Sequence, residues 1–112
     1  MSHVLEQLMS VLEDRKINPP PNSYTAKLYA GGDVKIGAKI TEEAHELVEA
    51  SGEPGDQGRR HLIYEASDLM YHMLVLLAHH GIKLEELENE IARRFGQSGL
   101  EEKAKRTVVA AN

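Results

Sequence analysis

Apolar residues recur three and four positions apart along most of this chain, which is the spacing of amphipathic helices. The first such stretch predicts a helix from about Ser2 to Asp14 or Lys16. Three prolines at 19–21 end it, because proline lacks a donor N–H and disfavours helix before it. Extended alternating patterns do not occur, so an all-α protein is expected.

Caps and glycines divide the next part of the chain. Ser23 can cap a short helix over residues 24–29, which a pair of glycines closes. Asp33 can cap a longer helix from Val34 to about Ala50. A stretch rich in glycine, proline and polar residues then predicts a loop over residues 51–58.

The second half of the chain predicts three more helices. The most apolar of them runs from about Arg59 to His80, with Gly81 as its stop signal. An amphipathic helix follows over residues 84–95. A capping box beginning at Ser98 opens a last short helix.

These elements predict a four-helix-bundle-like subunit in one domain over residues 1–106, with 107–112 as a frayed tail. One helix is unusually apolar, because between residues 69 and 78 it offers mainly Tyr71 and His72 as polar side chains. We therefore expect a homodimer in which the second subunit covers this helix. The alternative is a central helix covered within one chain, which needs more covering residues than 112 comfortably supply.

Composition excludes several classes of function. The formal net charge of −5 argues against a protein that coats nucleic acid. The absence of cysteine excludes disulfides and thiolate metal sites and fits a reducing cytoplasm. The longest apolar run is too short to span a bilayer, and the N-terminus has no secretory leader pattern, so a soluble cytoplasmic protein is expected.

Two acidic clusters carry the chemistry that the sequence suggests. Glu42, Glu43 and Glu46 share one helix edge, and Glu65 and Asp68 share another at the head of the apolar helix. Most glutamate pairs at this spacing are solvated surface, but carboxylates entering a buried helix are costly unless a cation neutralises them. Oxygen ligands from two facing helices suit a hard divalent cation, and Mg²⁺ is the predicted one.

Lysines lie near these carboxylates and could hold phosphate. Lys35 and Lys39 are on the helix that carries the first cluster, and Lys27 lies upstream. Carboxylates that hold a metal beside lysines that hold phosphate are typical of phosphoryl chemistry on a nucleotide. Taken singly, each lysine is an ordinary solvated helix residue.

The histidines carry less information. His72 follows Asp68 by four residues and could contact the substrate, although a histidine satisfied in the core or at an interface explains it equally well. His45 and His61 flank the two clusters but are left out of the site, because magnesium prefers oxygen ligands.

Several short motifs occur in an order that resembles a known family. They are Ser23-Tyr24-Thr25-Ala26-Lys27-Leu28, Lys35-Ile36, Lys39 leading to Glu42-Glu43-Ala44, Tyr64-Glu65-Ala66-x-Asp68-Leu69-x-Tyr71-His72, and Ser98-Gly99-Leu100-Glu101-Glu102-Lys103-Ala104. The paired acidic signature resembles the MazG-like all-α nucleoside triphosphate pyrophosphatases, and over residues 4–106 the chain resembles the phosphoribosyl-ATP pyrophosphatase family. Departures from the family pattern at residues such as Thr41 and Lys83 fall on none of the carboxylates in the two acidic clusters.

The resemblance implies a cytoplasmic homodimer that uses Mg²⁺ to hydrolyse the α–β phosphoanhydride of phosphoribosyl-ATP. Two alternatives stay open: a pyrophosphatase that removes free or damaged nucleoside triphosphates, and a non-catalytic helical dimer that binds partners. The predicted site comprises metal ligands Glu43, Glu46, Glu65 and Asp68, catalytic residues Glu42, Glu43 and Glu46, and substrate-binding residues Lys27, Lys35, Lys39, Tyr24 and His72.

Overall fold

The structure is a computed structural model that describes residues 2–95, and within that range it contains four helices and no strand. They are α1 (Ser2–Ile17), α2 (Tyr24–Ala50), α3 (Gly55–His79) and α4 (Leu84–Arg94). The all-α prediction is confirmed. The predicted helix that opens at Ser98 and the predicted tail over 107–112 lie outside the described residues.

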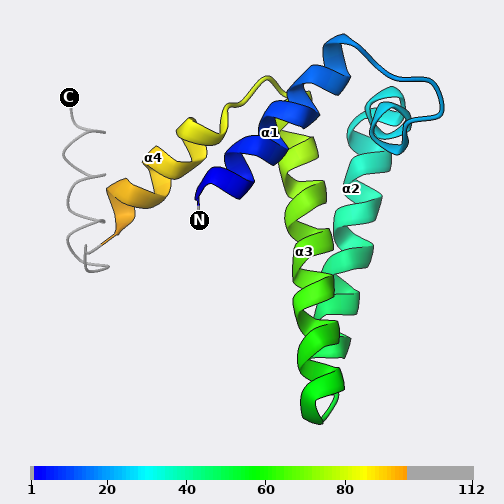
Figure 1. Ribbon diagram of the computed structural model, residues 1–112, viewed down its shortest axis with the longest axis vertical. Helices are drawn as coiled ribbons and strands as arrows, with labels where there is room; N and C mark the ends of the chain where they lie inside the picture. The colour runs from blue at the N-terminus through cyan, green and yellow to red at the C-terminus, as the bar shows by residue number, and fades with distance from the viewer. Residues whose placement is uncertain (1, 96–112) are drawn as a thin grey trace.

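The long helices α2 and α3 pack side by side as an antiparallel pair, joined by a short loop (Figure 1). α1 packs against both of them at the end where α3 finishes, and α4 leads away from that end and contacts α1. The core therefore lies at the junction of all four helices, whereas the other end of the pair consists of α2 and α3 alone. The buried apolar residues of this core are Met9, Leu12, Leu28, Ile36, Leu74, Val75, Ala78 and Leu84.

The predicted break in α2 is present at Gly32, whose backbone is not helical (φ 66°, ψ −160°). The short first segment begins as predicted, because the Ser23 hydroxyl accepts a hydrogen bond from the backbone N–H of Ala26 at 3.2 Å. Asp33 lies directly after the break, and its carboxylate accepts a hydrogen bond from Nε2 of His80 at 2.7 Å. The break thus sets the direction in which the second segment runs along α3.

The loop predicted over residues 51–58 is shorter in the structure, because α3 already begins at Gly55. Asp56 lies in the first turn, where a negative charge is favourable beside the free N–H groups of the helix. Gly58 is buried inside this turn, and its N–H donates to the carbonyl of Pro54 at 3.3 Å. Glycine usually signals a loop, but at position 58 the missing side chain lets the backbone of Glu53 pack closely on the helix.

The apolar stretch of α3 is only partly covered within one chain. Leu74 and Val75 are fully buried, whereas Met70 and Met73 each keep 38% of their surface exposed. α4 likewise leaves Phe95, which follows its last residue, 83% exposed. Within residues 2–95, no helix combines the length and the apolar character needed to cross a membrane.

Candidate metal and phosphate site

Three of the predicted metal ligands come together between α2 and α3. Glu43, Glu46 and Glu65 each offer one carboxylate oxygen, and these oxygens lie within 4.8 Å of one another. Glu43 and Glu65 are buried, and Glu46 is half-buried. Two helices bring the group together, because Glu43 and Glu46 are one turn apart on α2 while Glu65 faces them from α3.

This arrangement is electrostatically unfavourable without a cation. Burial, together with the charges of Asp68 and Glu46, raises the pKa of Glu43 to about 7. Burial also raises the pKa of Glu46, and so do the hydrogen bond to Glu65 and the negative charge of Glu65. Within the described residues, Oε2 of Glu43 and Oε2 of Glu65 are buried without a hydrogen-bond partner. Orphaned carboxylate oxygens of this kind suit a hard divalent cation.

The other two predicted acids lie at the margin of this group. Asp68 is half-buried and outside the group of three, although its charge acts on Glu43. Glu42 is exposed and faces Lys39, whose Nζ is 3.4 Å from its Oε2. The roles of all five acids as ligands or catalytic groups stay predictions.

Lys39 is the predicted phosphate-binding lysine that lies closest to the carboxylates. Its Nζ is 3.9 Å from Oε1 of Glu43. Burial lowers the pKa of Lys39, but Tyr24, Glu42 and Glu43 outweigh that effect and the pKa is raised, so the side chain is cationic at neutral pH. Lys35 is one turn earlier on the same helix edge, where its side chain lies over Gly31. Lys27 is exposed on the short segment before Gly32.

Two further predicted substrate contacts, Tyr24 and His72, join the short segment of α2 to α3. Nδ1 of His72 donates to the carbonyl of Asp68 at 2.9 Å, because a carbonyl can only accept. In the neutral ring, Nε2 then accepts the hydroxyl proton of Tyr24 at 2.8 Å. Beside this pair, the hydroxyl groups of buried Thr25 and half-buried Tyr71 share a hydrogen bond. Burial raises the pKa of Tyr24, so its phenol stays protonated at neutral pH.

The sequence interpretation missed one contact to the acidic group. His61, which was set aside because magnesium prefers oxygen, lies with Nε2 at 3.1 Å from Oε1 of Glu65. Its other ring nitrogen faces the carboxylate of Glu53. A hydrogen bond to Glu53 raises the pKa of His61 and outweighs burial, which acts in the opposite direction. The spacing of four residues between His61 and Glu65 is the sequence signal that could have indicated this contact, because such residues are neighbours on a helix.

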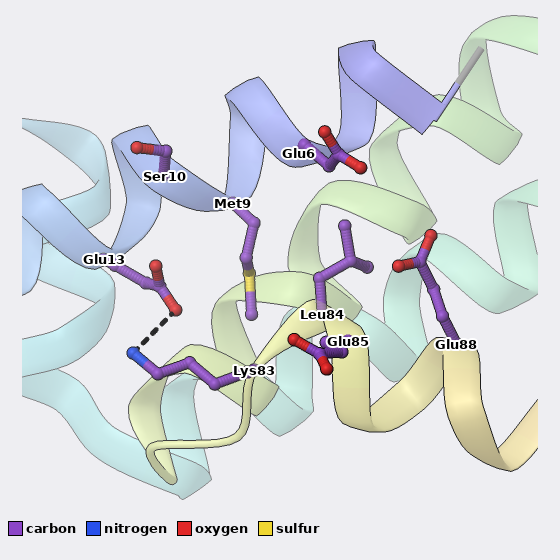
Figure 2. A pocket seen from close by; sticks show the side chains of 8 residues that line it. All are labelled: Glu6, Met9, Ser10, Glu13, Lys83, Leu84, Glu85 and Glu88. Atoms are coloured by element: carbon purple, nitrogen blue, oxygen red, sulfur yellow. Dashed lines mark ion pairs between the residues drawn. The ribbon is translucent and has the colours of Figure 1, made fainter.

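A separate hollow of ≈ 440 Å³ lies between α1 and α4 (Figure 2). Met9 extends from α1 toward α4 and Leu84 extends from α4 toward α1, and Lys83 forms an ion pair with Glu13 at 3.3 Å. Its remaining acidic lining consists of Glu6, Glu85 and Glu88. Four carboxylates against one paired lysine would repel phosphate, so this hollow does not suit an anionic substrate.

Carboxylates gathered between antiparallel helices beside a lysine define an all-α protein suited to metal-assisted chemistry on phosphates. Residues 5–95 match the family described as Phosphoribosyl-ATP pyrophosphohydrolase, and the chain belongs to this family.

Curated relatives named phosphoribosyl-ATP pyrophosphatase agree with this assignment. The protein of Rhodopirellula baltica is 55% identical over 102 residues, which cover 91% of this chain and 85% of the relative. The protein of Methylococcus capsulatus is 49% identical over 105 residues, covering 92% and 95%. That of Neisseria meningitidis serogroup C is 44% identical over 104 residues, covering 93% and 94%. The resemblance expected from the sequence is confirmed.

Proposed function

We propose that this chain hydrolyses the α–β phosphoanhydride of phosphoribosyl-ATP to phosphoribosyl-AMP and pyrophosphate, the second step of histidine biosynthesis. The observation that carries the proposal is the group of Glu43, Glu46 and Glu65 with Lys39 beside it, in a chain of this family. A non-catalytic helical protein would have no use for buried carboxylates that repel one another.

Mg²⁺ is the cofactor in this proposal, and the residues fit it. Glu43, Glu46 and Glu65 would hold the ion, with Asp68 completing the set, and the two orphaned Oε2 atoms are the natural first ligands. When bound, Mg²⁺ supplies positive charge that neutralises the phosphates and makes the phosphorus more electrophilic.

The chain's own residues bind and orient the substrate. Lys39, with Lys35 one turn away, would hold the phosphate oxygens, and Lys27 is the weaker third candidate. Glu42 is exposed and close to Lys39, so it can orient or deprotonate the attacking water. Tyr24 and His72 form a hydrogen-bonded pair of polar side chains, and this arrangement is consistent with the substrate contact predicted for them.

A homodimer in the cytoplasm completes the proposal. A groove of ≈ 420 Å³ lies where α1 meets the outer face of α3, and its lining is mostly apolar. Met70 lies in it, and Met73 is one turn further along α3. Exposed apolar surface of this kind marks an interface, and a two-fold partner would cover both copies at once.

The test is an assay of pyrophosphate release from phosphoribosyl-ATP and from a panel of ordinary nucleoside triphosphates, with Mg²⁺ and with EDTA. We expect Mg²⁺-dependent turnover that strongly favours phosphoribosyl-ATP. The amide variants Glu46→Gln and Asp68→Asn should lower turnover by orders of magnitude while circular dichroism stays helical. Preference for the ordinary triphosphates would instead identify the triphosphate-removing pyrophosphatase, and near-normal turnover of both amide variants would exclude the metal site.

A further inference from the structure

Outside the predicted ligand set, one side chain bridges a ligand to a second carboxylate. His61 is on α3, one turn before Glu65, and its Nε2 is 3.1 Å from Oε1 of that residue. Its Nδ1 lies 3.0 and 2.9 Å from the two carboxylate oxygens of Glu53. Each ring nitrogen therefore contacts a different carboxylate, and the imidazole is held at both ends.

The backbone is shaped to bring Glu53 to this position. Glu53 lies in the loop before α3, and Gly58 in the first full turn of α3 packs directly on it. A Cβ at Gly58 would collide with the backbone carbonyl of Glu53, so any other residue here would push the loop away. The contact from Glu53 to His61 therefore depends on a glycine that the helix itself would not favour.

We propose that His61, anchored by Glu53, is a positioning residue that fixes the Glu65 carboxylate for metal binding. The proposal rests on the proposed metal site. The hydrogen bond holds Oε1 of Glu65, while its Oε2 is buried without a hydrogen-bond partner, and one oxygen of this carboxylate lies within 4.8 Å of oxygens of Glu43 and Glu46. A ligand held in one orientation loses little freedom when the ion binds, and partners of this kind are commonly worth 10–100-fold in metal affinity.

An ordinary surface pair is the alternative explanation, and the chain contains one for comparison. His45 and Glu49 have the same spacing of four residues on α2, with Nε2 and Oε1 3.4 Å apart. Both side chains of that pair are mostly exposed, whereas the Glu65 side chain is only 7% exposed. His45 is therefore a matched control for the loss of a histidine beside a glutamate.

Mg²⁺ binding to the purified full-length chain, measured by calorimetry without substrate, tests the proposal. We expect His61→Leu to weaken Mg²⁺ binding roughly 10–100-fold, and His61→Gln, whose amide can still donate to Glu65, to recover much of the loss. Glu53→Ala should weaken binding less than His61→Leu, because it frees the ring without removing it. His45→Leu should bind as wild type does.

Glu65→Gln separates the two proposals. If this variant and the wild-type chain bind Mg²⁺ equally, the metal site itself is wrong. If Glu65→Gln abolishes binding while His61→Leu and Glu53→Ala both bind as wild type does, only the positioning role is overturned. Equal weakening by His61→Leu and His45→Leu would also overturn it, because the effect would then be general surface electrostatics. Thermal melting of each variant confirms that folded protein is compared.

Discussion

At the scale of single residues, the metal-ligand role proposed for Glu43 opposes the stability of the metal-free chain. Its carboxylate is buried among other acids and has no cation among the described residues except Lys39 nearby, at 3.9 Å. Burial and the neighbouring carboxylates together raise its pKa from 4.5 to about 7, so around neutral pH the metal-free folded state keeps a proton that the unfolded chain releases. This placement is costly for the metal-free fold and supports the ligand role proposed for Glu43.

The metal-free protein should consequently lose stability as pH rises. The pKa of Glu43 is higher in the folded state, so its favourable contribution is present below about pH 4.5 and is lost as pH rises through about 7. Glu43→Gln removes the penalty and should raise the unfolding free energy at pH 8 in EDTA by roughly 1–2 kcal/mol, while Mg²⁺-dependent turnover disappears. Urea unfolding of the wild-type chain and of Glu43→Gln at pH 5 and pH 8 measures this difference in unfolding free energy. A variant less stable than wild type at pH 8 would contradict the argument.

Lys39 gives a prediction about phosphate. Lys39→Met keeps the aliphatic stem and deletes the charge that faces Glu42 and Glu43. A hydrogen bond to a charged group is worth about 1.5–3 kcal/mol, so kcat/KM for phosphoribosyl-ATP should fall roughly 10–100-fold. Lys83→Met is the control, because its ion pair with Glu13 is at the α1–α4 junction. Wild-type kcat/KM in Lys39→Met would show that the phosphates lie elsewhere.

At the scale of elements, the break in α2 connects the fold to the site. The short segment before Gly32 carries Tyr24, which reaches His72 on α3, and the segment after it carries the glutamates. A backbone with φ 66° and ψ −160° belongs to a region that essentially only glycine adopts. The two segments can therefore serve one site only while residue 32 has no side chain.

Two glycines of α2 should consequently respond in opposite ways to alanine. Gly32→Ala forces a side chain into the glycine region and should cost roughly 1–3 kcal/mol. Gly37→Ala is the matched control, because Gly37 is helical and a Cβ there meets nothing within 4 Å. Gly37→Ala should be neutral or stabilise by about 0.5–1 kcal/mol. Urea midpoints measure both changes, and equal effects of the two variants would refute the assignment of the break.

The helices were largely predictable because periodicity and caps are local signals. α4 begins at Leu84 as predicted and ends one residue before the predicted Phe95, and the break at Gly32 follows from the glycine pair. The start of α3 was predicted four residues too late. Glycine usually marks a loop, but Gly58 lies in the first turn of α3 with Glu53 packed against it, a close approach that spacing alone does not reveal.

The site was less predictable than the helices, because spacing shows which residues share a face but not how deeply they are buried. Glu42 and Glu43 are adjacent in sequence, yet only Glu43 is buried and joins the group with Glu65. His61 was excluded by ligand chemistry alone, although a residue can assist a metal site without touching the ion. Its contact to Glu53 spans a loop and a helix, so no single-helix pattern contains it.

At the scale of the whole molecule, one chain covers its helices unevenly. α1 packs against one end of the α2–α3 pair, and the other end extends beyond it (Figure 1). On α3, Ile63 is 58% exposed and aligns with Met70 and Met73 at helical spacing. On α4, Ile91 is 53% exposed, and Phe95 directly after the helix is 83% exposed. Two apolar faces on different elements of one chain offer a partner copy two surfaces to cover.

The homodimer prediction is tested by charge placed on these faces. Burying a methionine fully is worth about 1.5–3 kcal/mol, and an unpaired carboxylate in the same position is costly. Met73→Glu should therefore dissociate the protein, and activity should fall together with the dimer if the partner helps to complete the site. Glu49→Gln, on the exposed surface of α2, is the control and should leave both unchanged. Sedimentation at micromolar concentration measures the mass: a wild-type chain that runs as a 12.5 kDa monomer and still turns over substrate would refute the dimer and leave the metal site standing.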